Sequence, residues 1–95
     1  MLSMIVTVRV KPGREADYAR IAGDFGRLVE AERPGAILFR TYPTDDPLVF
    51  ITIEHFEDEK ALAFHQAHDG TKEKLAELAD ILDGGLQVQK FTEEI

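Results

Sequence analysis

The sequence contains no cysteine, which excludes disulfides, zinc–thiolate sites and a cysteine nucleophile. It also has no apolar run long enough to span a bilayer, and its start, MLSMIVTVRVK, lacks the basic segment and small-residue cleavage site of a signal peptide. No glycine-rich phosphate loop is present, which argues against nucleotide and nicotinamide chemistry. We therefore expect a cytoplasmic protein without a membrane partner.

Basic residues are also scarce. The chain has 11 Lys and Arg against 18 Asp and Glu, a net charge of −7. Nucleic-acid binding depends on clustered Lys and Arg, so we expect no nucleic-acid partner. The acidic residues are scattered, which is typical of a solvated surface. At 95 residues and 44% hydrophobic, the chain is predicted to form one domain over residues 1–95.

Alternation, helical periodicity and chain breakers predict seven elements. The expected strands are 4–10, 36–42, 48–56 and 86–92, and the expected helices are 15–33, 58–68 and one between Asp69-Gly70 and Gly84-Gly85. A five-residue turn, 43–47, joins the second and third strands. The order β-α-β-β-α-α-β predicts an α+β, ferredoxin-like protomer with an antiparallel sheet.

The first and the last predicted helices each have a feature that concerns packing. Gly23 and Gly26 weaken the first helix by about 1 kcal/mol each relative to alanine, which suggests close packing on the sheet. The last helix is expected to place its apolar residues on one face, namely Leu75, Leu78, Ala79 and Leu82.

Both faces of the predicted sheet are apolar. Ile51 and Phe50 point to opposite faces, and Ile37 with Phe39 are expected to oppose Leu38 and Tyr42. Helices can cover only one face of such a sheet. We therefore expect a homodimer in which a second copy covers the other face, forming a dimeric α+β barrel.

Several short motifs occur in a characteristic order. They are Val10-Lys11-Pro12-Gly13, then Glu32-Arg33-Pro34-Gly35, then Phe50-x-x-x-Glu54-x-Phe56-x-Asp58-x-x-Ala61-x-x-x-His65. Over roughly residues 4 to 92 this series resembles the antibiotic biosynthesis monooxygenase (ABM) family of the dimeric α+β barrel superfamily. The resemblance implies a pocket between each protomer's sheet and helices. It also implies oxygenation of phenols or hydroquinones by O₂ without metal, flavin or haem.

Other members of that family degrade haem or isomerise a phosphorylated sugar. The positions of the haem-degrading members' asparagine, tryptophan and histidine ligand correspond here to Val6, His65 and Leu75. The absence of a ligand at Leu75 argues against haem. We therefore expect no cofactor and no metal.

Two histidines are the candidate catalytic residues. Histidine titrates near neutral pH and can take the proton of a phenol. His65 is the first choice because it lies on the pocket-side helix at the motif position, and His68 is the second. Either can instead be a packed or exposed helix residue. His55 is expected on the opposite sheet face, and His65-x-x-His68-Asp69 lacks a convincing third metal ligand.

Four further residues are candidates for substrate binding. Tyr18, Phe25 and Phe64 can line an aromatic pocket, although aromatics at helical spacing are more often core. Arg40 can pair with a substrate anion, or form a salt bridge or dimer contact. Glu54 is interpreted as structural.

Taken together, these features favour a cofactor-independent monooxygenase that oxidises a small phenolic or quinol-type substrate with O₂. Two alternatives stay open. One is a non-catalytic small-molecule-binding or regulatory module, and the other is an isomerase of a small carbonyl compound.

Overall fold

The computed structural model describes residues 1–92 and residue 95. Its elements are β1 (Leu2–Arg9), α1 (Glu15–Glu32), β2 (Ala36–Pro43), β3 (Val49–Phe56), α2 (Glu59–Ala67), α3 (Asp69–Leu78) and β4 (Gln87–Phe91). The strand order in the sheet is β2-β3-β1-β4, and every neighbouring pair is antiparallel. The predicted ferredoxin-like α+β fold is therefore confirmed. None of the helices in the described part of the chain is both long and apolar enough to cross a membrane.

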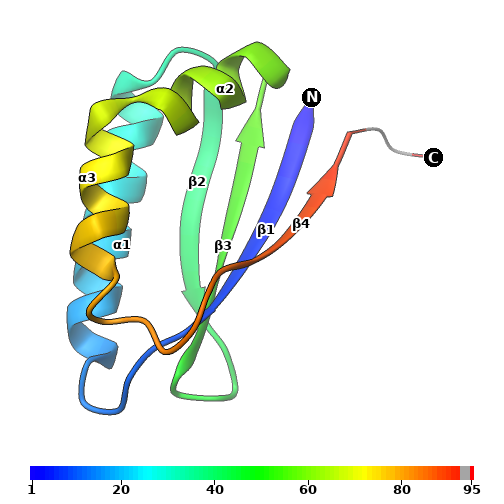
Figure 1. Cartoon of the computed structure of the whole chain (residues 1–95). Helices are drawn as coiled ribbons and strands as arrows, with labels where there is room; N and C mark the ends of the chain where they lie inside the picture. The colour runs from blue at the N-terminus through cyan, green and yellow to red at the C-terminus, as the bar shows by residue number, and fades with distance from the viewer. Residues whose placement is uncertain (93–94) are drawn as a thin grey trace.

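The helices lie on one side of the sheet (Figure 1). Strand β3 shows the division most clearly, because its burial alternates along its whole length. Its buried, helix-facing residues are Phe50, Thr52, Glu54 and Phe56, and its half-buried residues on the opposite face are Val49, Ile51, Ile53 and His55. We call this opposite side the open face.

Helix α1 packs closely on β2 through a glycine. The helix buries a stripe formed by Tyr18, Ile21, Ala22, Phe25, Gly26 and Val29. A Cβ added at Gly26 would clash with the Phe39 carbonyl oxygen, so the predicted close packing is confirmed there. Gly23 has no such neighbour, because an added Cβ would meet only the Arg27 side chain at 3.7 Å. Gly26 alone is required by helix–sheet packing.

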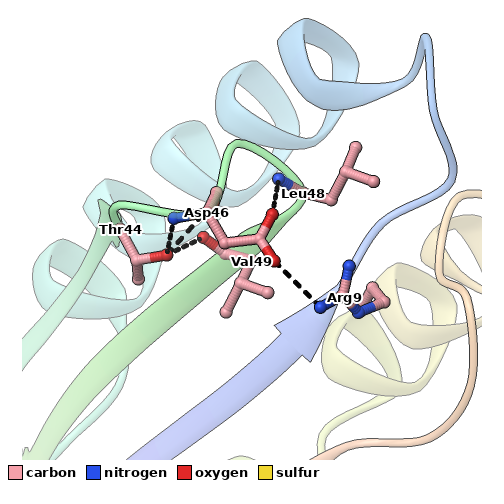
Figure 2. Close-up of polar contacts among 5 residues, drawn as sticks. All are labelled: Arg9, Thr44, Asp46, Leu48 and Val49. Atoms are coloured by element: carbon pink, nitrogen blue, oxygen red, sulfur yellow. Dashed lines mark hydrogen bonds and ion pairs between the residues drawn. The ribbon is translucent and has the colours of Figure 1, made fainter.

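The turn between β2 and β3 is held by side chains (Figure 2). The Asp46 carboxylate accepts a hydrogen bond from the Leu48 N–H at 3.0 Å and pairs with Arg9 at 2.9 Å. The Thr44 hydroxyl donates to the Val49 carbonyl at 2.9 Å. These contacts tie the turn to the end of β1, and the predicted hairpin is confirmed with its turn at residues 44–48.

The boundary between α2 and α3 differs from the prediction. Asp58 caps α2 as expected, accepting from the Ala61 N–H at 2.8 Å. The break falls at His68 and not at Asp69-Gly70, which form the first turn of α3. The cause is the His68 side chain, whose Nδ1 accepts from the Gly70 N–H at 2.9 Å and so starts a new helix.

Two other expectations are wrong. Helix α3 ends at Leu78, and Leu82 lies beyond it in a β-bridge with Val10. The pairing of β2 with β3 shifts between Ala36 and Leu38, so Ile37 is left out of register and half-exposed instead of sharing one sheet face with the buried Phe39.

Large apolar side chains gather on the open face, where none of the helices and strands described for residues 1–92 covers them. From the strand register they include Ile5, Leu38, Tyr42, Ile51, Ile53 and Phe91. The helix-facing side, in contrast, holds two core clusters, one around Tyr18 and Phe50 and one around Phe25 and Phe56. Val6 packs against both clusters. The expectation that both sheet faces are apolar is confirmed.

Candidate functional site

A cavity of about 200 Å³ lies between the sheet and the helices. Its apolar wall includes Val6, Val8, Phe25, Phe39, Leu62, Leu75 and Leu78. Its polar side chains are Tyr18, Thr41, Thr52, Glu54, His65, Gln66, Thr71 and Lys74. A cavity with mostly apolar walls and a few polar groups is the usual form of a small-molecule site.

Glu54 lies in the middle of β3 and is only 6% exposed. It pairs with Met4 on β1 and with Phe39 on β2, and it lines the cavity. No Lys, Arg or His within the described residues forms an ion pair with its carboxylate. Burial without a paired cation raises the pKa of Glu54 from its ordinary 4.5 to about 7. The carboxyl is therefore divided between its acid and its carboxylate near neutral pH.

His65 lies on α2 with only 4% of its surface exposed. Its ring centroid is 6.0 Å from Phe25, 5.4 Å from Phe39 and 5.3 Å from Phe56. Its Nδ1 is 3.5 Å from the Thr71 hydroxyl, the outer limit of a hydrogen bond. Burial, assisted by the charges of Arg33 and His68, lowers the pKa of His65 to about 4. Its imidazole is neutral at pH 7.

Tyr18 and Phe25 belong to the core and also line the cavity. The Tyr18 ring lies 5.0 Å from Phe50, and the Phe25 ring makes an edge contact with Phe39 at 5.6 Å. Burial raises the pKa of Tyr18, and the nearby Glu54 raises it further against an opposing hydrogen bond from Thr52. The phenol of Tyr18 is therefore a hydrogen-bond donor at neutral pH.

The other three sequence candidates lie outside the cavity. His68 uses its Nδ1 to cap α3, and Phe64 is half-exposed on α2 against the His68 ring. Arg40 lies on the edge strand β2, where its Nε pairs at 3.1 Å with Glu30 of α1. Each is occupied by a local structural contact. Among residues 1–92 and 95, no three His, Asp or Glu side chains form a group that could hold a metal ion.

Sequence reasoning missed Glu54 as a site residue and did not consider Arg33. The signal for Glu54 was available, because its alternation with Phe50, Thr52 and Phe56 places it on the helix-facing side. Arg33 is buried at the end of α1, and its Nε and Nη2 have no hydrogen-bond partner among the described residues. Its position beside His65 and Gly70 could not be inferred from the sequence pattern.

The fold and cavity define a ferredoxin-like α+β protein with an internal site of small-molecule size. The sequence of residues 1–83 matches the family model described as antibiotic biosynthesis monooxygenase (ABM). The chain belongs to the ABM family. No curated protein matches the sequence with significance.

Solved structures agree with this fold. A candidate antibiotic biosynthesis monooxygenase from Caulobacter crescentus superposes with a TM-score of 0.91 at 19% identity, over 99% of this chain and 90% of that one. A candidate antibiotic biosynthesis monooxygenase from Nitrosomonas europaea superposes with a TM-score of 0.89 at 19% identity, over 98% of both chains. A conserved protein from Methanosarcina mazei gives 0.88 at 19% identity, over 98% of this chain and 92% of that one. At these identities, the likeness is one of fold.

Proposed function

We propose that this protein is a homodimeric monooxygenase that oxidises a small phenol or quinol with O₂ and without a bound cofactor. The observation that supports this most is the unpaired Glu54 carboxyl, with a pKa of about 7, in the wall of an apolar cavity. Membership of the ABM family supports the reaction class. Haem does not fit the site, because the cavity is only about 200 Å³ and Leu75 offers no ligand.

Oxygenation of a phenol starts with removal of its proton, since the electron-rich phenolate transfers electrons to O₂. A phenol and O₂ together yield a quinone and water when a carbon ortho or para to the hydroxyl bears hydrogen, and a hydroquinone and O₂ likewise yield a hydroxyquinone and water. The atoms and electrons balance, so no external reductant is required. The protein must accept the phenolic proton and exclude water from the reacting ring.

Glu54 is the better proton acceptor of the two buried groups. A phenol has a pKa of roughly 10, about three units above that of Glu54, so the transfer costs about 4 kcal/mol. Transfer to His65, with a pKa of about 4, costs about 8 kcal/mol. We therefore assign proton acceptance to Glu54. His65 and Tyr18, both neutral, serve as hydrogen-bond partners for the substrate oxygen.

Cavity size favours a substrate with one ring. An apolar cavity of about 150 Å³ accommodates benzene, so about 200 Å³ suits one substituted ring. A multi-ring quinol would extend beyond this volume.

The experiment is oxygen-electrode screening of metal-free protein with monocyclic phenols and hydroquinones, followed by Glu54→Gln. Loss of one general base lowers the rate by roughly 10²–10⁴-fold. Glu57→Gln, an exposed carboxylate outside the cavity, is the matched control and should keep the wild-type rate. An absence of oxygen uptake with every phenol, or an active Glu54→Gln, contradicts the proposal.

A carbonyl isomerase is the second candidate, and the same carboxyl favours it. A base with a pKa of about 7 in a mostly apolar cavity can remove a proton adjacent to a carbonyl group. Exchange of substrate C–H for deuterium under nitrogen, dependent on Glu54, would support the isomerase over the oxygenase.

A further inference from the structure

Lys74 lies on the cavity-facing side of α3. Among the described residues that line the cavity, it is the only Lys or Arg. Although it lies on a surface helix, its side chain is only 28% exposed. Most of the side chain is therefore covered, which is typical of a lysine whose aliphatic stem packs on apolar residues while its ammonium group reaches toward water.

Burial shows which end of the cavity Lys74 occupies. Glu54 and His65 are 6% and 4% exposed, so they form the deep end. Leu75, which follows Lys74 in the chain, is 48% exposed. Leu86 and Val88, from the β4 side, are 45% and 51% exposed. These residues form the mouth of the cavity, and Lys74 lies beside Leu75 at that end.

The contact that Lys74 makes is easily exchanged. Its Nζ lies 2.7 Å from Glu77 one turn along α3, and the Glu77 side chain is half-exposed. Ion pairs of this kind contribute little to stability, so a ligand carboxylate can replace Glu77 at small cost. The remainder of the molecule disfavours anions, because the net charge is −7 and Glu54 lies at the deep end. Lys74 is thus the feature that makes an acidic ligand acceptable.

We propose that the substrate carries an acidic group, and that Lys74 binds this group at the cavity mouth while the reacting hydroxyl points to Glu54. The assignment rests on the proposed function for the position of the hydroxyl. It narrows the substrate class to single-ring phenols with a carboxylate or similar anion on the side of the ring away from the reacting oxygen. Lys74 is a specificity-determining residue in this arrangement.

The test uses two probes of equal size, 3-hydroxyphenylacetate and 3-hydroxyphenylacetamide, with calorimetric binding under nitrogen. Wild-type protein should bind the acid about tenfold more tightly than the amide, because a charge-assisted hydrogen bond replaces a neutral one. Lys74→Met should remove this preference by weakening only the acid. Lys72→Met, an exposed lysine of α3 outside the cavity, should keep it.

Two additional variants guard against a simple folding defect. Lys74→Arg keeps the charge and should retain a preference for the acid, whereas Glu77→Gln frees Lys74 and should tighten acid binding a fewfold, about the effect of one surface ion pair. Equal binding of acid and amide to the wild type, or no binding of either, overturns the proposal. An equal effect of Lys72→Met and Lys74→Met also overturns it.

Oxygen uptake, measured with the same two compounds, separates this inference from the proposed function. A preference for the acid without oxygen uptake supports the ligand assignment and contradicts the oxygenase. Oxygen uptake with neutral phenols and no preference for the acid supports the oxygenase and contradicts the role of Lys74.

Discussion

Glu54 on β3 and His65 on α2 line the same cavity, and burial shifts their pKa values in opposite directions, to about 7 and about 4. Their ordinary order, with histidine the stronger base, is thereby reversed. Burial is the main cause of both shifts, because it disfavours the charged form of each group, and Arg33 and His68 add to the shift of His65. At neutral pH the cavity contains a carboxyl able to accept a proton and an imidazole that stays neutral.

The first prediction concerns the pH dependence of turnover. The rate of phenol oxidation should rise with pH as Glu54 loses its proton and should level off above about pH 7. The profile of kcat/KM for a phenol between pH 5 and 9 measures this rise. Glu54→Gln should remove it, and a wild-type rate that does not vary over this range would exclude Glu54 as the proton acceptor.

His65→Gln provides the second prediction. Because the imidazole is neutral and glutamine can still form hydrogen bonds, turnover at pH 7 should fall no more than about tenfold, with fold and assembly intact. Steady-state kinetics of His65→Gln, Glu54→Gln and the wild type, measured side by side, give the loss of turnover for each variant. If His65→Gln loses as much turnover as Glu54→Gln, then His65 is the proton acceptor and the assignment to Glu54 is wrong.

The third prediction concerns stability. Folded Glu54 keeps its proton up to about pH 7, whereas the unfolded chain releases it near 4.5, so the free energy of unfolding falls as pH rises through this window. The difference of 2.5 units between the folded and the unfolded pKa of Glu54 lowers the free energy of unfolding by about 3 kcal/mol above pH 7. Glutamine does not titrate. The free energy of unfolding of Glu54→Gln, relative to that of the wild type, should therefore increase by about 3 kcal/mol from pH 4.5 to pH 8.

Urea denaturation at the two pH values measures this gain. Glu57→Gln, at an exposed position, serves as the control and should show no comparable change. If Glu54→Gln and the wild type keep a constant difference from pH 4.5 to 8, the Glu54 carboxyl is not destabilised by burial.

Assembly gives the fourth prediction. Ile51 lies on the open face, where we propose that a second copy packs, so Ile51→Asp should convert the dimer to monomers in sedimentation experiments. Leu28→Asp, at an exposed position of α1, should leave the dimer intact. Phe39→Asp should unfold the chain, because Phe39 belongs to the core. A stable, folded wild-type monomer at micromolar concentration would refute the dimer.

The fifth prediction compares two glycines of α1. Gly23→Ala should stabilise the protein by about 1 kcal/mol, because the position is open and alanine favours the helix. Gly26→Ala should destabilise it by about 1–3 kcal/mol, because the new methyl group overlaps the Phe39 carbonyl oxygen. Urea denaturation of both variants measures the contrast. Equal effects would mean that α1 can move away from β2.

The order of elements could be predicted from the sequence because alternation and chain breakers are local signals. The position of Ile37 could not, since the shift in register arises from pairing between β2 and β3. The start of α3 was also missed. His68 caps that helix with a ring nitrogen, and sequence rules look first for Ser, Thr, Asp or Asn at such a position.

The candidate site was predicted in part. The inward position of His65 followed from its spacing to Ala61 and Leu62 on α2, and Tyr18 and Phe25 followed from the apolar stripe of α1. Phe64 and Arg40 could not be excluded from periodicity, because neither contact is visible in it. Phe64 packs on the His68 ring one turn further along the chain, and Arg40 pairs with Glu30 of α1. Glu54 was assigned a structural role from its motif, although the alternation of β3 already placed it inside.

His68 is both the last cap of α2 and the first cap of α3, so a single residue joins the two helices. Each residue added to or removed from a helix rotates all that follows by about 100°. One residue inserted in the first turn of α3, directly after His68, would turn Thr71, Lys74 and Leu78 away from the cavity together, while leaving their identities unchanged. The number of residues between His65 and Thr71 therefore decides which α3 side chains line the cavity, and α3 residues of two such chains can be compared only where this spacing is the same.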